Sequence, residues 1–156
     1  MLTLQEISDR LEIQELLVRY SHAVDTADWE AFERVFTPDA RIDYTAMGGV
    51  EGGVKEVREW LESVMTLFAG CQHLVSNTVL GFHGADVAHA RTICHNPLVV
   101  DRADGGSEVM WCGLWYLDVL VRTQDGWRIS ERREERCYSP VAAGSIVAND
   151  RRGGSR

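Results

Sequence analysis

Residues 16–44 read LLVRYSHAVDTADWEAFERVFTPDARIDY, and this stretch alone predicts a helix, a second helix and a strand in quick succession. Apolar residues at helical spacing indicate an amphipathic first helix from about residue 4 to residue 23. They are Leu4, Ile7, Leu11, Leu16, Tyr20 and Val24, with Ile13 and Leu17 beside them. Asp28 is a suitable N-cap for a short helix over residues 29–36, which Thr37-Pro38-Asp39 ends. The alternating segment ARIDYTAM, residues 40–47, then predicts a strand.

Working outward, the glycines of GGVEGG separate this strand from a third helix over residues 54–68. From Cys71 onward the apolar period changes to two, which predicts a run of consecutive hairpins. Their strands cover residues 71–82, 87–100, 108–122 and 127–138. Helices first and long strands after them favour an α+β fold, with three N-terminal helices on a strongly curved, mostly antiparallel sheet that encloses a pocket.

Composition limits the classes of partner. The chain has 156 residues and a net charge of −8, and its basic residues are dispersed arginines, which argues against nucleic acid or anionic lipid. No window approaches a membrane span, and the N-terminus lacks the pattern of a secretory signal, so we expect a cytoplasmic protein. The length favours one domain over residues 1–139, and the sparsely apolar tail over residues 140–156 is expected to fray.

Six residues combine the side-chain chemistry of proton transfer with positions in the predicted helices and strands. They are Tyr20, Asp25, Tyr44, His73, His95 and Asn96. A carboxylate bonded to one imidazole nitrogen selects the tautomer and stabilises the imidazolium, so that the other nitrogen can move a proton. A phenol can donate a hydrogen bond to a carbonyl that becomes enolate-like. Taken alone, each of these residues is more often structural, and only their combination points to a site.

The combination resembles the SnoaL-like branch of the nuclear transport factor 2-like superfamily, which includes scytalone dehydratase. The resemblance rests on residues 16–44, on CQHLVSN in the middle, and on WYLDVLVRTQDGWRISER near the end. It implies a cone-shaped single domain around a pocket. It also implies a homo-oligomer, a dimer or trimer, built on the outer surface of the sheet.

In lyases of this family an Asp after the first helix and a His on a later strand form the catalytic pair. The resemblance places Asp25 and His73 at those positions. It makes Tyr20 and Tyr44 the expected substrate-binding tyrosines. Where the family's dehydrochlorinase has a lysine, this chain has Tyr20, so dehydrochlorination is disfavoured.

The strand opposite His73 leaves two alternatives for a further substrate-binding residue. A two-residue turn at Gly84-Ala85 would place Asn96 opposite His73, whereas a three-residue turn would turn His95 toward the pocket, because a one-residue slip reverses the faces of a strand. The small residues at 88, 90, 92 and 94 lie on the same face of the strand as Asn96, and this face is expected to be the packed interior side. We therefore favour Asn96 and keep His95 in reserve.

These features predict a cofactor-independent lyase, dehydratase-like, that acts on a small hydrophobic cyclic substrate with a carbonyl group. An isomerase or polyketide cyclase in the same pocket is one alternative, and a non-catalytic binding module is another. No metal site is expected, because His83 and His89 lie in or near a turn. Candidate lining residues are Phe36, Met47, Trp111 and Trp115. The charged run over residues 131–136 is interpreted as a solvated strand end with one or two residues at the pocket rim.

Overall fold

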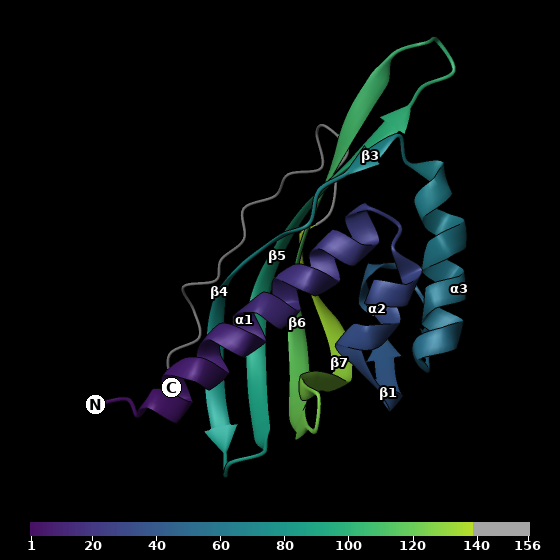
Figure 1. Ribbon diagram of the computed structural model, residues 1–156. Helices are drawn as coiled ribbons and strands as arrows, with labels where there is room; N and C mark the ends of the chain where they lie inside the picture. The colour runs from purple at the N-terminus through teal and green to yellow at the C-terminus, as the bar shows by residue number, and fades with distance from the viewer. Residues whose placement is uncertain (139–156) are drawn as a thin grey trace, which may run out of the picture.

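The computed structural model describes residues 1–138 and places three helices against one curved sheet (Figure 1). The helices are α1 (Leu4–Asp25), α2 (Trp29–Val35) and α3 (Val54–Val64), with short 3-10 turns η1 (Thr45–Met47) and η2 (Met65–Leu67). The strands are β1 (Phe36–Asp43), β2 (Glu51–Gly52), β3 (Gly70–Cys71), β4 (Leu74–His83), β5 (Val87–Asp101), β6 (Ser107–Thr123) and β7 (Gly126–Tyr138). The tail predicted for residues 140–156 lies outside the described residues.

The sheet has the order β2-β1-β7-β6-β5, and both β3 and β4 pair with the far side of β5. Only β1 and β7 run parallel in the described sheet, because β4 to β7 follow one another as hairpins. Figure 1 shows α1 crossing one face of the sheet, with α2 and α3 gathered near β1. The structure therefore confirms the α+β class, the three helices and the mostly antiparallel curved sheet.

The C-terminal half of α1 supplies much of the core, but its first turns do not. Leu16 and Tyr20 are buried against the sheet, whereas Leu4, Ile7 and Leu11 are 86%, 42% and 61% exposed. The predicted apolar stripe was therefore wrong for the first half of the helix. At about 100° per residue, Leu4, Ile7 and Leu11 lie on the side of the helix opposite Asp9 and Ile13, which are the residues buried against the sheet.

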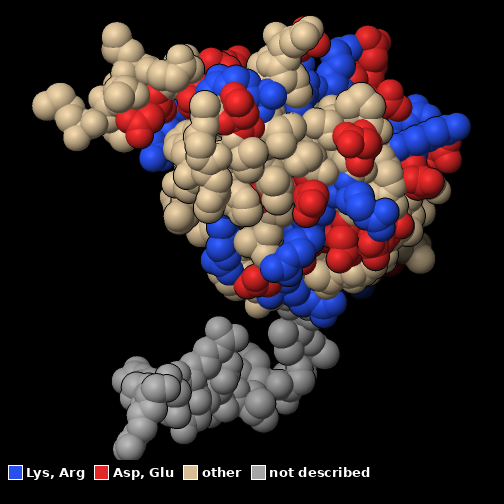
Figure 2. All heavy atoms as spheres, turned by 90° about the horizontal axis from the view of Figure 1, so that it is seen from below, with Lys and Arg blue, Asp and Glu red and all other residues tan. Residues whose placement is uncertain are grey.

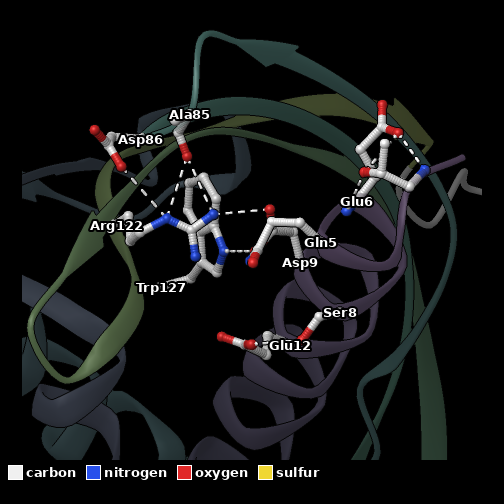
Figure 3. A network of polar contacts seen from close by, with 10 residues as sticks. Gln5, Glu6, Ser8, Asp9, Glu12, Ala85, Asp86, Arg122 and Trp127 are labelled. Carbon is white, nitrogen blue, oxygen red and sulfur yellow. Dashed lines mark hydrogen bonds and ion pairs between the residues drawn. The ribbon is translucent and has the colours of Figure 1, made fainter.

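Asp9, rather than an apolar residue, anchors the first turns of α1 to the sheet (Figure 3). Its carboxylate accepts hydrogen bonds from the Arg122 guanidinium at 2.8 Å, from the Trp127 indole at 3.2 Å and from Gln5 at 3.0 Å. Asp9 itself is only 5% exposed. These three donors satisfy a buried charge and join α1 to the β6–β7 hairpin.

The β4–β5 hairpin combines a three-residue turn with a bulge. His83 pairs with Val87, so the turn has three residues, the longer of the two alternatives considered from the sequence. The register then slips between Ser76 and Val79, where Asn77 has a φ of 51°. Beyond the slip Leu74 pairs with His95, which places the preceding residue opposite Asn96. The extra residue of the bulge shifts the pairing register by one position, which cancels the one-residue shift that the longer turn causes.

The predicted strand over residues 71–82 is interrupted at His73, between β3 and β4. Gln72 donates its backbone N–H to the carbonyl of Pro97 at 3.2 Å, but Pro97 has no N–H to return. Gln72 and Pro97 occupy a hydrogen-bonded position of the antiparallel pair, so the N–H of the next residue, His73, points away from β5 and is available for a side-chain acceptor.

Three predicted boundaries were wrong near the helices. The first strand begins at Phe36 instead of residue 40, and it ends at Asp43, so Tyr44 lies just beyond it at the start of η1. Pairing of this strand with β7 is irregular between Phe36 and Arg41, where Pro38 removes a donor. The third helix ends at Val64 and continues as η2.

The surface carries mixed charge. On the face shown in Figure 2, Lys and Arg side chains are interspersed with Asp and Glu. Among the helices of residues 1–138, none combines the length and the apolar character needed to cross a membrane.

Candidate active site

A cavity of about 210 Å³ lies between the concave face of the sheet and α3. Its polar lining includes Tyr20, Tyr44, His73, Asn96, Tyr116 and Glu134. Apolar side chains make up most of the remaining wall, namely Met47, Trp60, Leu61, Val64, Met65, Phe68, Leu98, Met110 and Leu114. A larger open groove of about 670 Å³ lies over outward-facing residues such as Arg91 and Glu131, away from these polar groups. The cavity that holds the polar groups is therefore the candidate site.

His73 and Asp25 contact each other in two ways. Nδ1 of the His73 ring lies 2.6 Å from Oδ1 of Asp25, and the backbone N–H of His73 donates to Oδ2 at 2.9 Å. Asp25 is the last residue of α1, and His73 occupies the break between β3 and β4. The imidazole is 7% exposed and the carboxylate 21%. The break in the ladder allows both contacts, and together they hold the ring in one orientation.

The third member of this hydrogen-bonded series is Asn96 on β5. Its Nδ2 lies 2.9 Å from Nε2 of His73. An ionised Asp25 only accepts, so the neutral imidazole carries its proton on Nδ1 and Nε2 is the acceptor for the Asn96 amide. The Nε2 lone pair at the wall of the cavity therefore accepts from the Asn96 amide.

The charge of Asp25 is stabilised by His73. Burial alone would raise the pKa of the Asp25 carboxyl, but the hydrogen bonds from the ring and backbone of His73 outweigh it and lower the pKa below its ordinary value of 3.8. Asp25 is therefore ionised at neutral pH. A carboxylate beside an imidazole stabilises the imidazolium that forms when Nε2 takes a proton.

Tyr20 and Tyr44 form a buried pair on the opposite wall. Their hydroxyl oxygens are 2.6 Å apart. Burial is the largest cause of a raised pKa for both phenols, so both keep their protons. One O–H is used within the pair, which leaves one O–H proton able to donate to a ligand.

A buried ion pair between Arg132 and Asp118 packs against the ring of Tyr20. Arg132 binds Asp118 through two hydrogen bonds of 2.7 and 2.8 Å, and neither side chain is exposed. The guanidinium lies 4.0 Å from the ring centre of Tyr20 and 4.1 Å from that of Tyr116. These cation–π contacts position the Tyr20 ring, and with it the phenol pair.

Glu134 on β7 is the other acidic residue of the cavity wall. Its Oε2 is buried with no hydrogen-bond partner among residues 1–138. Burial raises the pKa of its carboxyl to about 8, although the nearby Arg132 charge opposes that rise. The sequence interpretation of the run 131–136 as a solvated strand end was wrong for Arg132 and Glu134.

Three residues near the His73 end could hold a metal ion. Asp25, Cys71 and His73 each offer one ligand atom within 4.8 Å of one another. Burial and the hydrogen bond to Asp25 raise the pKa of the Cys71 thiol to about 12. Nδ1 of His73 and Oδ1 of Asp25 already share a hydrogen bond of 2.6 Å, which a metal ion at this cluster would replace.

The structure brings together Tyr20, Asp25, Tyr44, His73 and Asn96 but not His95. His95 lies on the outer face of the sheet, where its ring stacks near Trp111 and its Nδ1 contacts the Tyr138 hydroxyl. Of the predicted lining residues only Met47 lines the cavity. Phe36 belongs to the core, Trp111 is half exposed, and Trp115 lies under Arg91. Trp60 was not predicted to line the cavity, and Glu134 was not singled out within the run 131–136, of which one or two residues were expected at the rim.

A cone of three helices and a bent sheet around a small polar-and-apolar cavity defines a small-molecule-binding class of fold. The family model of the SnoaL-like domain matches residues 5–133, and the chain therefore belongs to this family. The resemblance stated from the sequence is confirmed. The uncharacterized protein Rv2910c of Mycobacterium tuberculosis is 48% identical over 141 residues, which are 90% of this chain and 94% of that protein.

Several solved structures have the same cone-shaped fold, but their names refer to different activities. A provisionally named scytalone dehydratase of Novosphingobium aromaticivorans has a TM-score of 0.80 and 18% identity over 99% of this chain and 100% of that one. Hexachlorocyclohexane dehydrochlorinase LinA-type3 of Novosphingobium barchaimii has a TM-score of 0.71 and 19% identity, covering 94% and 98%. A provisionally named aromatic ring hydroxylase of N. aromaticivorans reaches 29% identity at a TM-score of 0.75, covering 85% and 91%. The fold is shared, and the reaction has to be argued from the site.

Proposed function

We propose that this protein is a cofactor-independent lyase that removes water from a small cyclic β-hydroxy carbonyl compound. The observation that supports this most strongly is the hydrogen-bonded series from Asp25 through His73 to Asn96 at the cavity wall. In this series a carboxylate orients an imidazole whose other nitrogen can act as a base, and general acid–base catalysis requires such a pair. The kinship with named dehydratases and dehydrochlorinases is consistent with elimination chemistry.

In the proposed reaction, the substrate takes the place of the Asn96 amide at Nε2 of His73. Nε2 removes a proton from the carbon next to the carbonyl, and the C–H electrons form an enolate. The enolate then forms the carbon–carbon double bond as the β-hydroxyl leaves with the proton that the imidazolium returns. Substrate is thereby converted to an unsaturated carbonyl compound and one water, and His73 ends as it began. Asp25 stabilises the intermediate imidazolium throughout.

The phenol pair of Tyr20 and Tyr44 stabilises the negative charge of the enolate. Because Tyr20 and Tyr44 share one hydrogen bond, one O–H remains to donate toward the negative charge that develops on the substrate oxygen. Both phenols stay protonated at neutral pH, so the donor is present without any change of ionisation.

The cavity indicates the size of the substrate. Its volume of about 210 Å³ lies below the roughly 300–1,000 Å³ of sites for drug-sized ligands. A molecule with one or two rings suits this space better than a four-ring steroid. The apolar walls from α3, η2 and β6 favour a hydrophobic ring.

The test is turnover of cyclic β-hydroxy ketones by the wild type and by His73→Gln, with mass detection of the product. We expect loss of one water in the wild type and a rate lower by about 10²- to 10⁴-fold in the variant, because a general base contributes about that factor. His83→Gln, an exposed histidine in the same hairpin, is the matched control and should retain full activity.

Two outcomes would overturn the proposal. Equal water loss by the wild type and His73→Gln would remove His73 from the mechanism. Rearranged product of unchanged mass, abolished in His73→Gln, would show an isomerase or cyclase that uses the same base.

A further inference from the structure

We propose that Glu134 binds the carbonyl oxygen of the substrate as a neutral carboxylic acid, and that this contact selects ligands with a carbonyl at the β7 side of the cavity. The inference rests on the proposed function and deepens it, because it adds a substrate-binding residue and a required feature of the ligand.

The geometry of the cavity supplies the first argument. Glu134 lies opposite Tyr116 in the β6–β7 register and lines the same cavity as His73 and Asn96. Two polar atoms of this cavity are buried without a partner among residues 1–138, and they are Oε2 of Glu134 and Oδ1 of Asn96. A buried polar atom without a partner is costly, so a ligand that supplies both partners gains affinity.

The protonation of Glu134 follows from its surroundings. Burial raises the pKa of the carboxyl to about 8, the Arg132 charge opposes the rise, and the Asp43 charge adds to it. Arg132 binds Asp118 through Nε and Nη2, its Nη1 is buried without a partner, and within residues 1–138 no ion pair of 4.0 Å or less joins it to Glu134. The other titratable groups around the carboxyl are Tyr20, Tyr44, Cys94, Cys112 and Tyr116, all of which are neutral at pH 7 because burial raises each pKa.

These protonation states define complementary ligand groups. A neutral carboxylic acid has an O–H that donates, and a ligand carbonyl is a suitable acceptor. A carboxylic acid kept neutral by an apolar site is a known means of binding a carbonyl as it becomes enolate-like. The free Oδ1 of Asn96 accepts, so a ligand hydroxyl suits it. The β6 partners of Asn96 and Glu134 are Cys112 and Tyr116, so their backbones are two strands and four positions apart, about 10 Å across the sheet and about 13 Å along it. The carbonyl contact with Glu134 therefore does not require a contact of the same ring system with Asn96.

The experiment measures binding, so it does not depend on turnover. The probes are 1-tetralone and tetralin, two bicyclic molecules of similar size of which only the first has a carbonyl. Fluorescence of Trp60, which lines the cavity, reports binding. At pH 7 we expect the wild type to prefer 1-tetralone by about tenfold, because one buried hydrogen bond is worth about that factor. Glu134→Leu should lose the preference. Glu134→Gln, which retains an N–H donor, should keep most of it.

The pH dependence separates a binding role from a purely structural one. In the wild type the preference should disappear as the pH rises through about 8, because the ionised carboxylate has no proton to donate. In Glu134→Gln the preference should not change with pH. Glu135→Gln, on the opposite face of β7 beside Arg91, is the matched control and should behave as the wild type.

The inference is overturned if Glu134→Leu retains the wild-type preference, or if the preference does not change between pH 7 and pH 9. A failure of the dehydratase proposal is recognised separately, by absence of water loss from hydroxy ketones, and it leaves the binding result interpretable. Infrared detection of a protonated carboxyl that is present in the wild type and absent in Glu134→Gln checks the protonation directly.

Discussion

At the scale of single residues, Asp25 and Glu134 show how hydrogen-bond donors decide the state of a buried carboxyl. Burial raises the pKa of both groups. Asp25 receives hydrogen bonds from the ring and backbone of His73, and these lower its pKa below the ordinary value. Glu134 receives none at Oε2, and its pKa stays near 8. The same chemical group is thus an anion at one side of the cavity and a neutral acid at the other.

Replacement of Asp25 by Asn should make the protein less stable at pH 7 by about 2 kcal/mol, since hydrogen bonds to a charged group are worth about that much. The folded pKa of Asp25 is lowered, so its stabilisation is present above the unfolded value of 3.8 and is lost as the pH falls through the folded value. Urea denaturation at pH 7 and pH 3 should show a difference from the wild type that shrinks in acid. Asp39→Asn, at an exposed position, provides the control, and a difference that is constant with pH would contradict the account.

The residues of the site differ in how far the sequence could predict them. The family motifs identified Asp25 and His73, and the parity of small residues favoured Asn96, which lines the cavity. Glu134 was missed because the β6–β7 register shifts between Val119 and Leu120. Trp127 and Ile129 point inward before this irregularity, and Arg132 and Glu134 point inward after it. When the inward-facing positions change from odd to even residue numbers within one strand, a simple alternation of apolar and polar residues cannot predict which side chains face inward.

At the scale of elements, β4 shows why turn length alone could not decide which residue faces His73. The turn has three residues, which alone would have favoured His95, and the bulge at Asn77 restores the pairing that places His73 opposite Asn96. Turn residues such as Gly84 are recognisable in a sequence, whereas a bulge depends on the partner strand. Helix and strand order was predictable from the change of apolar period, but the ends of β1 and α3 were not.

The bulge makes a prediction about Asn77, whose φ of 51° is in the left-handed region. A β-branched side chain is disfavoured there, so Asn77→Val should lower the free energy of unfolding by about 1–2 kcal/mol. Asn77→Gly should leave it nearly unchanged, because glycine accepts this backbone conformation. Chemical denaturation measures both variants. Equal stability of Asn77→Val and the wild type would show that the bulge is absent in solution.

At the scale of the whole molecule, the α+β order, the curved sheet and the family were all predictable, because they depend on long repeating patterns. The cavity was predictable as a consequence of the concave face, and so was much of its polar lining, but most of its apolar lining was not, since α3 and η2 contribute much of that wall. The homo-oligomer implied by the family resemblance stays a prediction. So do the expected cytoplasmic location and the boundary between domain and tail.

The central claim is that His73 removes a proton from the carbon next to a substrate carbonyl. Its most direct test is incubation of 1-tetralone with the protein in heavy water, with mass detection of deuterium, because this ketone has no β-hydroxyl to lose. The account predicts deuterium at the carbon next to the carbonyl with the wild type and with His83→Gln, and only the uncatalysed background with His73→Gln. Incorporation by His73→Gln at the wild-type rate would contradict it.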